Sequence, residues 1–130
     1  MSITNARTSL TLSELENLSG TIYSGCYGFS VLEICVDVYP NQVCAKLKLL
    51  GFEVERTCTT WSQNGSELTA EIGLGNPTVG YWKLDNARLV VKLNSETNDG
   101  SVGFSAELLK LTFSGYKKQR EWKNETIFEW

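Results

Sequence analysis

The feature that most constrains this chain is the alternation of apolar and polar residues between Val43 and Leu74. Successive side chains of a β-strand point to opposite faces, so this alternation predicts half-buried strands. Asn64-Gly65 interrupts the pattern. An Asn-Gly pair between two alternating runs is typical of a tight hairpin turn, because both residues tolerate positive φ. The stretch therefore predicts an antiparallel sheet.

The preceding stretch, from Phe29 to Leu50, predicts another hairpin with Pro40-Asn41 as a two-residue turn. This register joins apolar residues on one face: the pairs are Leu32 with Leu49, Ile34 with Leu47, Val36 with Ala45, and Val38 with Val43. The other face joins polar residues: the pairs are Glu33 with Lys48, Cys35 with Lys46, and Asp37 with Cys44. We therefore expect Glu33 and Asp37 to face solvent and not to form a catalytic pair. A four-residue loop would keep the same apolar face but oppose Cys35 to Cys44, and the sequence leaves both registers open.

The apolar phase slips by one residue at Leu50-Gly51. A slip at glycine inside a strand is typical of a β-bulge, so we interpret Val43–Trp61 as one long bent strand shared by two hairpins. A bent strand of this kind favours closure into a small barrel or a β-sandwich.

Two registers remain possible at Asn64-Gly65. A two-residue loop places Leu68, Ala70 and Ile72 beside Trp61, Thr59 and Thr57. A three-residue loop places Leu68, Ala70, Ile72 and Leu74 beside Thr60, Cys58, Arg56 and Val54. We favour the second, because it keeps Phe52 and Val54 on the buried face. It also turns Arg56 inward, where a guanidinium is costly unless it is paired or holds a ligand.

Further strands are predicted downstream. The runs Thr78–Leu84 and Ala87–Leu93 flank Asp85-Asn86, which predicts a turn, and Asn94–Gly100 predicts an exposed loop. The next apolar residues change phase after Leu108, which indicates a second bulge near Leu108-Leu109. Residues 117–130 form a charged tail that also carries Trp122, Ile127, Phe128 and Trp130. Such a tail is expected to pack back as a helix or strand, or to bind a partner.

At the other end, residues 1–10 predict a loose arm. Thr11 and Glu14 have capping-box spacing before a short helix that ends near Asn17. The expected fold is thus a single domain, residues 1–130, that is mainly β. It is an antiparallel meander of seven to nine strands, curled into a small barrel or β-sandwich, with one short N-terminal helix.

Composition excludes several function classes. The chain has no histidine, which removes histidine-based triads, the usual acid–base residue and the commonest zinc ligand. The net charge of −3 argues against nucleic-acid binding. No segment predicts a signal peptide or a membrane span, so we expect a cytoplasmic protein with reduced cysteines and no cofactor or metal.

The remaining functional signal is one arginine and a set of aromatic residues near strand ends. The candidate ligand-binding residues are Arg56, Trp61, Tyr81, Trp82 and Tyr23. The favoured hypothesis is a barrel or sandwich that holds an apolar or amphipathic small molecule. The alternatives are a protein–protein interaction module of the inhibitor or immunity type, and a cofactor-independent isomerase or cyclase. Homo-oligomers through strand edges or the Trp122–Trp130 tail are also possible. A cavity would favour the binder, and a filled core would favour the interaction module.

Overall fold

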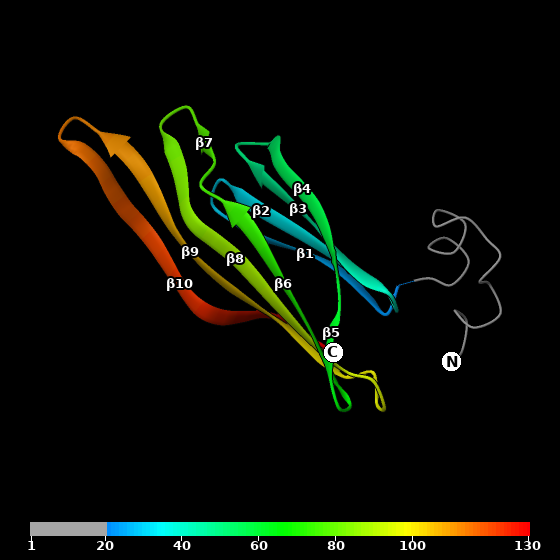
Figure 1. Ribbon diagram of the computed structural model, residues 1–130. Helices are drawn as coiled ribbons and strands as arrows, with labels where there is room; N and C mark the ends of the chain where they lie inside the picture. Colours follow the sequence, from blue (N-terminus) through cyan, green and yellow to red (C-terminus); the bar gives the residue numbers. More distant parts are fainter. Residues whose placement is uncertain (1–20) are drawn as a thin grey trace.

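The computed structural model describes residues 21–130, which form two antiparallel sheets that face each other (Figure 1). The four-stranded sheet has the order β1 (Tyr23–Phe29), β2 (Leu32–Val38), β3 (Gln42–Leu49) and β4 (Phe52–Thr60). The six-stranded sheet has the order β10 (Gly115–Glu129), β9 (Gly100–Thr112), β8 (Trp82–Asn94), β6 (Glu67–Gly75) and β5 (Ser62–Asn64), with β7 (Thr78–Val79) paired to β8. The mainly β fold class is confirmed, in its sandwich form.

The predicted N-terminal arm and helix lie outside the described residues. Within residues 21–130, no helix is long and apolar enough to cross a membrane.

The β2–β3 hairpin forms in the predicted register, with Pro40-Asn41 as its turn. The Tyr39 N–H donates to the Gln42 carbonyl across that turn at 2.8 Å. The eight apolar residues of the predicted face are all buried, and they pack against β6, β8 and β9 of the other sheet. Glu33 is exposed and Asp37 is half-buried on the opposite face, as expected from the alternation.

The predicted long bent strand is wrong. Leu50-Gly51 is a complete two-residue turn, with φ of 55° and 80°, and it joins β3 to β4. Two positive φ angles match the twist of a tight hairpin, but leucine is a rare residue for such a position. The phase slip therefore marks a reversal of the chain and not a bulge.

Neither predicted register at Asn64-Gly65 occurs. Asn64 pairs with Glu67, so the loop residues are Gly65 and Ser66, and the hairpin lasts only three residues on the β5 side. Before it, β4 pairs with β3 in the four-stranded sheet, and at Trp61 the chain crosses from there to the six-stranded sheet. β6 therefore takes β8, not β4, as its long partner.

This crossover also corrects the position of Arg56, which does not point inward. Arg56 lies opposite Lys46 on the outer, solvent-facing side of the four-stranded sheet. Thr57 and Thr59 occupy the inner phase instead, opposite the buried Ala45 and Val43. The guanidinium thereby avoids the desolvation that burial would impose.

The predicted turn at Asp85-Asn86 is also wrong. β8 runs unbroken through it. Asn86 (φ 52°) lies in the register shift against β9 between Asp85 and Arg88, just beyond the last β6 pair, Gly75 with Ala87. The turn is one element earlier, at Gly80-Tyr81, where Val79 pairs with Trp82. Asn86 tolerates the left-handed conformation equally well in a bulge and in a turn, which explains the misleading signal.

The exposed loop after Asn94 is confirmed, and the C-terminal tail packs back as β10. The bulge expected near Leu108-Leu109 is in the partner strand: Lys118 pairs with Leu109 and Arg120 with Leu108, leaving Gln119 as the extra residue. β9 itself pairs regularly with β8 through this region. The apolar residues that follow Leu108 in β9 are out of phase with its buried positions, and they therefore project outward.

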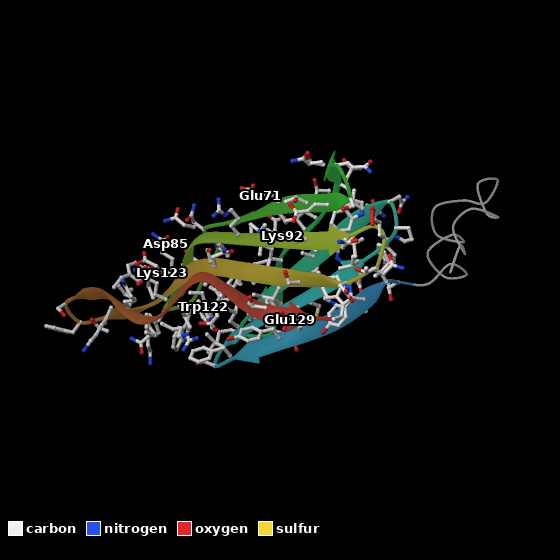
Figure 2. All side chains as sticks on the ribbon, turned by 90° about the horizontal axis from the view of Figure 1, so that it is seen from below. Glu71, Asp85, Lys92, Trp122, Lys123 and Glu129 are labelled. Atoms are coloured by element: carbon white, nitrogen blue, oxygen red, sulfur yellow. A yellow bond between two sulfur atoms is a disulfide. The ribbon has the colours of Figure 1, made fainter. Side chains whose placement is uncertain are left out.

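Aromatic residues join β10 to β1 along one side of the sandwich. The buried Trp122 indole donates to the Tyr27 hydroxyl at 3.0 Å, and its ring meets Phe29 edge-on at 5.4 Å. Further along, Trp130 stacks on Tyr23 at 4.6 Å. The large apolar side chains of the tail are thus used inside the domain. Figure 2 shows Trp122 and, further along β10, Glu129.

The prediction of reduced cysteines is wrong. Disulfides join Cys26 to Cys35 and Cys44 to Cys58, each between directly opposed residues whose Cα atoms are 4.0 Å apart. Antiparallel pairing brings opposed residues close enough for this link. The register predicted for β2–β3 already separates Cys35 from Cys44, and so excludes their pairing. Both disulfides lie on the outer face of the four-stranded sheet.

Candidate functional site

The five predicted site residues do not converge on one pocket. Tyr23 is packed on Trp130, and the Trp61 indole donates to the Tyr39 carbonyl at 3.1 Å near the sheet crossover. Tyr81 and Trp82 lie together at the β7–β8 turn, at the opposite end of the sandwich. Arg56 is separate from all four, on the outside of β4.

Arg56 is held by Glu53, three residues earlier on the same strand. Its Nη2 and Nε donate to the two Glu53 carboxylate oxygens at 2.7 and 3.2 Å. This hydrogen-bonded pair lowers the pKa of Glu53 and raises the pKa of Arg56. Both groups are exposed, so the pair is screened by water and contributes little to stability.

An open hollow of about 280 Å³ lies beside Arg56 on the outer face of the four-stranded sheet. Its lining includes Cys35, Cys44 and Cys58 of the two disulfides, together with Asp37 and Lys46. The Asp37 carboxylate accepts a hydrogen bond from the Ser24 hydroxyl at 2.5 Å. The hollow is open to solvent, and its charges of both signs favour no particular class of ligand.

The space between the sheets is filled by side chains. Buried residues from β2, β3, β6, β8, β9 and β10 form one continuous apolar cluster. Two larger hollows, of about 470 and 490 Å³, open to solvent at the sandwich ends and are lined mostly by exposed or half-buried residues. The interior thus resembles that of an ordinary packed domain.

The exposed large apolar side chains of the described residues gather at one end of the sandwich. They come from the β3–β4, β7–β8 and β9–β10 hairpins, and they are Leu50, Phe52, Tyr81, Leu111, Phe113 and Tyr116. We call these six residues the hairpin-tip surface. Phe113 is fully exposed, and Phe52 and Tyr81 are 65% and 67% exposed.

The three hairpins lie at the same end of the sandwich (Figure 1). The Leu111 N–H donates to the Tyr81 carbonyl at 2.6 Å, which ties the β9–β10 hairpin to the β7–β8 turn. Leu50 Cδ1 lies only 3.8 Å from the position that a Cβ on Gly80 would occupy, which brings the β3–β4 turn to the same place. In Figure 2 the β9–β10 hairpin extends past the labelled Asp85 and Lys123, away from Glu129. The chain's C-terminus lies at the opposite end.

Basic residues accompany these aromatic rings. Lys83 Nζ lies 5.4 Å from the centre of the Tyr116 ring, and Lys110 Nζ lies 5.2 Å from that of Trp82. Lys110 is directly opposite Lys117 across β9 and β10. Neither Lys110 nor Lys117 has a carboxylate within ion-pair distance among residues 21–130. Lys118, by contrast, has its pKa raised by hydrogen bonds to Glu107 and Glu121.

Five of the six hairpin-tip residues were not among the sequence-predicted site residues; only Tyr81 was. The signal for Leu111 and Phe113 was their shift out of the apolar phase of β9, which places them outside the core. Phe52 gave the same signal but was placed on the buried face of a bent strand, and Leu50 was interpreted as part of a bulge.

Comparisons of the chain with protein-family models, curated proteins and solved structures found no match. In the described part of the chain, no group of three or more cysteine, aspartate or glutamate side chains could hold a metal ion.

Proposed function

We propose that this protein is a docking module that binds a larger partner through the hairpin-tip surface. The observation that carries the proposal is that every exposed large apolar side chain of residues 21–130 lies at one end. Scattered surface apolar residues need no explanation, but a gathered patch is typical of an interaction site.

The filled core supports this function over a small-molecule carrier. A carrier of an apolar ligand needs an interior cavity of several hundred cubic ångströms. Here the apolar interior is occupied by packed side chains, and the hollows are open to solvent. The scattered positions of Arg56, Tyr23 and Trp61 also give a small ligand no shared set of contacts.

The two disulfides support residence in an oxidising compartment and not in the cytoplasm. Structural disulfides persist where thiols are not kept reduced by glutathione and thioredoxin. Each of the two here links neighbouring strands of the four-stranded sheet, and so makes the scaffold under the β3–β4 tip rigid.

Site-specific photo-cross-linking in the protein's native cells tests the docking function. A benzophenone side chain replaces Phe113 in one variant and Lys92 in a control variant, since Lys92 is exposed on β8 toward the other end. We expect a discrete adduct from position 113 that excess unlabelled protein suppresses, and none from position 92. Equal labelling from both positions, or no adduct from either, would contradict the proposal.

A further inference from the structure

Granted the proposed docking function, we infer that the partner is a lipid bilayer surface with anionic headgroups. The shape of the hairpin-tip surface is the first argument. The surface is built from three separate hairpin ends, not from a flat face, and Phe113 at the apex of the β9–β10 hairpin is fully exposed. A rigid protein partner would need a fitted pocket for each end. A bilayer interface yields to all three, and aromatic rings are preferred at that depth.

The charge of the surroundings is the second argument. Residues 109–120 contain four basic residues and no acidic one, in a chain whose net charge is −3. Two of the four, Lys118 and Arg120, are paired with glutamates. Lys110 and Lys117 face each other directly, which is a repulsive arrangement for cross-strand neighbours. Lipid phosphates beside the inserted rings would neutralise both ammonium groups at once.

The conformation of Leu50 is the third argument. A turn position with positive φ favours glycine, asparagine or aspartate, yet here it carries an apolar residue that is 40% exposed. The backbone conformation of the turn does not require leucine at this position. Contact of its side chain with acyl chains gives the residue a role.

The same charges disfavour a second copy of this chain as the partner. Two copies joined tip to tip would bring two unpaired Lys110–Lys117 pairs together, and like charges in an interface are repulsive. An acidic protein surface would satisfy the lysines, but it would leave the separate apolar ends without fitted pockets.

Vesicle co-sedimentation of the full chain, with its disulfides intact, tests the inference. The probes are phosphatidylcholine vesicles and vesicles in which about one third of the lipid is phosphatidylserine, which gives a negative surface potential. We expect binding to the anionic vesicles, weak binding to the neutral ones, and loss of binding as salt is raised.

Matched variants identify the residues responsible. Lys110→Gln with Lys117→Gln should weaken binding to anionic vesicles by about 30-fold, given the contribution of each lysine near such a surface. Phe52→Ser with Phe113→Ser should reduce binding at least tenfold on both kinds of vesicle, because apolar burial does not depend on headgroup charge. Lys46→Gln with Lys92→Gln removes the same charge away from the tip and should change affinity less than twofold. Melting curves confirm that each variant is folded.

No binding of the wild-type protein to anionic vesicles, or equal losses in the tip and control lysine variants, would overturn the lipid assignment. The cross-linking experiment separates this failure from failure of the docking function. A suppressible protein adduct at position 113 without vesicle binding would keep the docking function and reject the lipid. An adduct between two copies of the chain would identify self-association instead. A lipid adduct at position 113 together with vesicle binding supports both proposals.

Discussion

Among residues 21–130, Glu53 and Arg56 make the one side-chain pair in which both partners have shifted pKa values. The hydrogen bond from Arg56 favours the charged carboxylate, so the pKa of Glu53 is lowered from its ordinary 4.5. Because the folded-state pKa is lowered, the pair stabilises the fold at pH values above the ordinary pKa. This stabilisation is lost as the pH falls through the lowered pKa. Water screens the exposed pair, so this contribution is small.

We expect Arg56→Met to return the pKa of Glu53 toward 4.5 and to leave the melting temperature nearly unchanged. An NMR titration of the Glu53 side-chain carboxyl measures the first effect. Lys46→Met is the control, because Lys46 is a smaller cause of the same shift. A Glu53 titration that responds to Lys46 and not to Arg56 would show that the ion pair does not form in solution.

Ile34 and Lys46 test which face of the four-stranded sheet is buried. Ile34 is fully buried, whereas Lys46 lies on the outer face. Ile34→Ala should lower the free energy of unfolding by about 2–5 kcal/mol through lost burial and a residual cavity. Lys46→Ala should change it by less than about 0.5 kcal/mol. Urea denaturation measures both, and similar losses at the two positions would mean that the face assignment is wrong.

Individual residues were predictable where both strands of a hairpin could be seen in the sequence. Ile34 and Leu47 were placed correctly because the Pro40-Asn41 turn fixes the register of both strands at once. Arg56 was misplaced because its face was derived from a β4–β6 pairing that does not form. Its true partner strand, β3, gives the opposite face.

At the scale of elements, turn chemistry located some reversals and missed others. Leu50-Gly51 was missed because leucine seldom adopts positive φ, and Asp85-Asn86 was overvalued because Asn86 serves a bulge. The same conformational preference thus produced one false turn and hid a real one. β8 stays continuous here because it pairs with β9 up to Asp85 and with β6 from Ala87 onward, a non-local effect that no short window contains.

Leu50→Asn should stabilise the β3–β4 hairpin by about 0.5–1 kcal/mol, because asparagine adopts the left-handed conformation at lower cost. Chemical denaturation measures the gain. Phe52→Asn is the control: Phe52 is exposed on the same hairpin but does not have positive φ, so no gain is expected there. A destabilised Leu50→Asn protein would show that the leucine side chain contributes more to the turn than its backbone conformation costs.

At the scale of the whole molecule, the mainly β strand content followed from the sequence, but the choice of a sandwich over a barrel did not. The division into two sheets depends on the crossover at Trp61, where β4 leaves for one sheet and β5 starts the other. Nothing local to Trp61 distinguishes this crossover from the continuation of a hairpin. The hairpin-tip surface was unpredictable for the same reason, since it joins residues from three hairpins that meet only in the folded chain.

The disulfides divide the molecule unequally, because both lie in the four-stranded sheet and the six-stranded sheet has none. They close loops with sequence separations of 9 and 14 residues. By the chain-entropy model each contributes about 3 kcal/mol, a large part of the roughly 5–15 kcal/mol that holds a typical domain folded.

A phosphine reductant should therefore lower the melting temperature by roughly 15–25 °C. Scanning calorimetry of the oxidised and reduced protein measures this shift. Each disulfide is removed separately in the double variants Cys26→Ser with Cys35→Ser and Cys44→Ser with Cys58→Ser. The melting temperature of each variant should fall by about half of the full shift, and the reductant should then cause only the other half. An unchanged melting temperature after complete reduction would mean that strand pairing alone holds the four-stranded sheet.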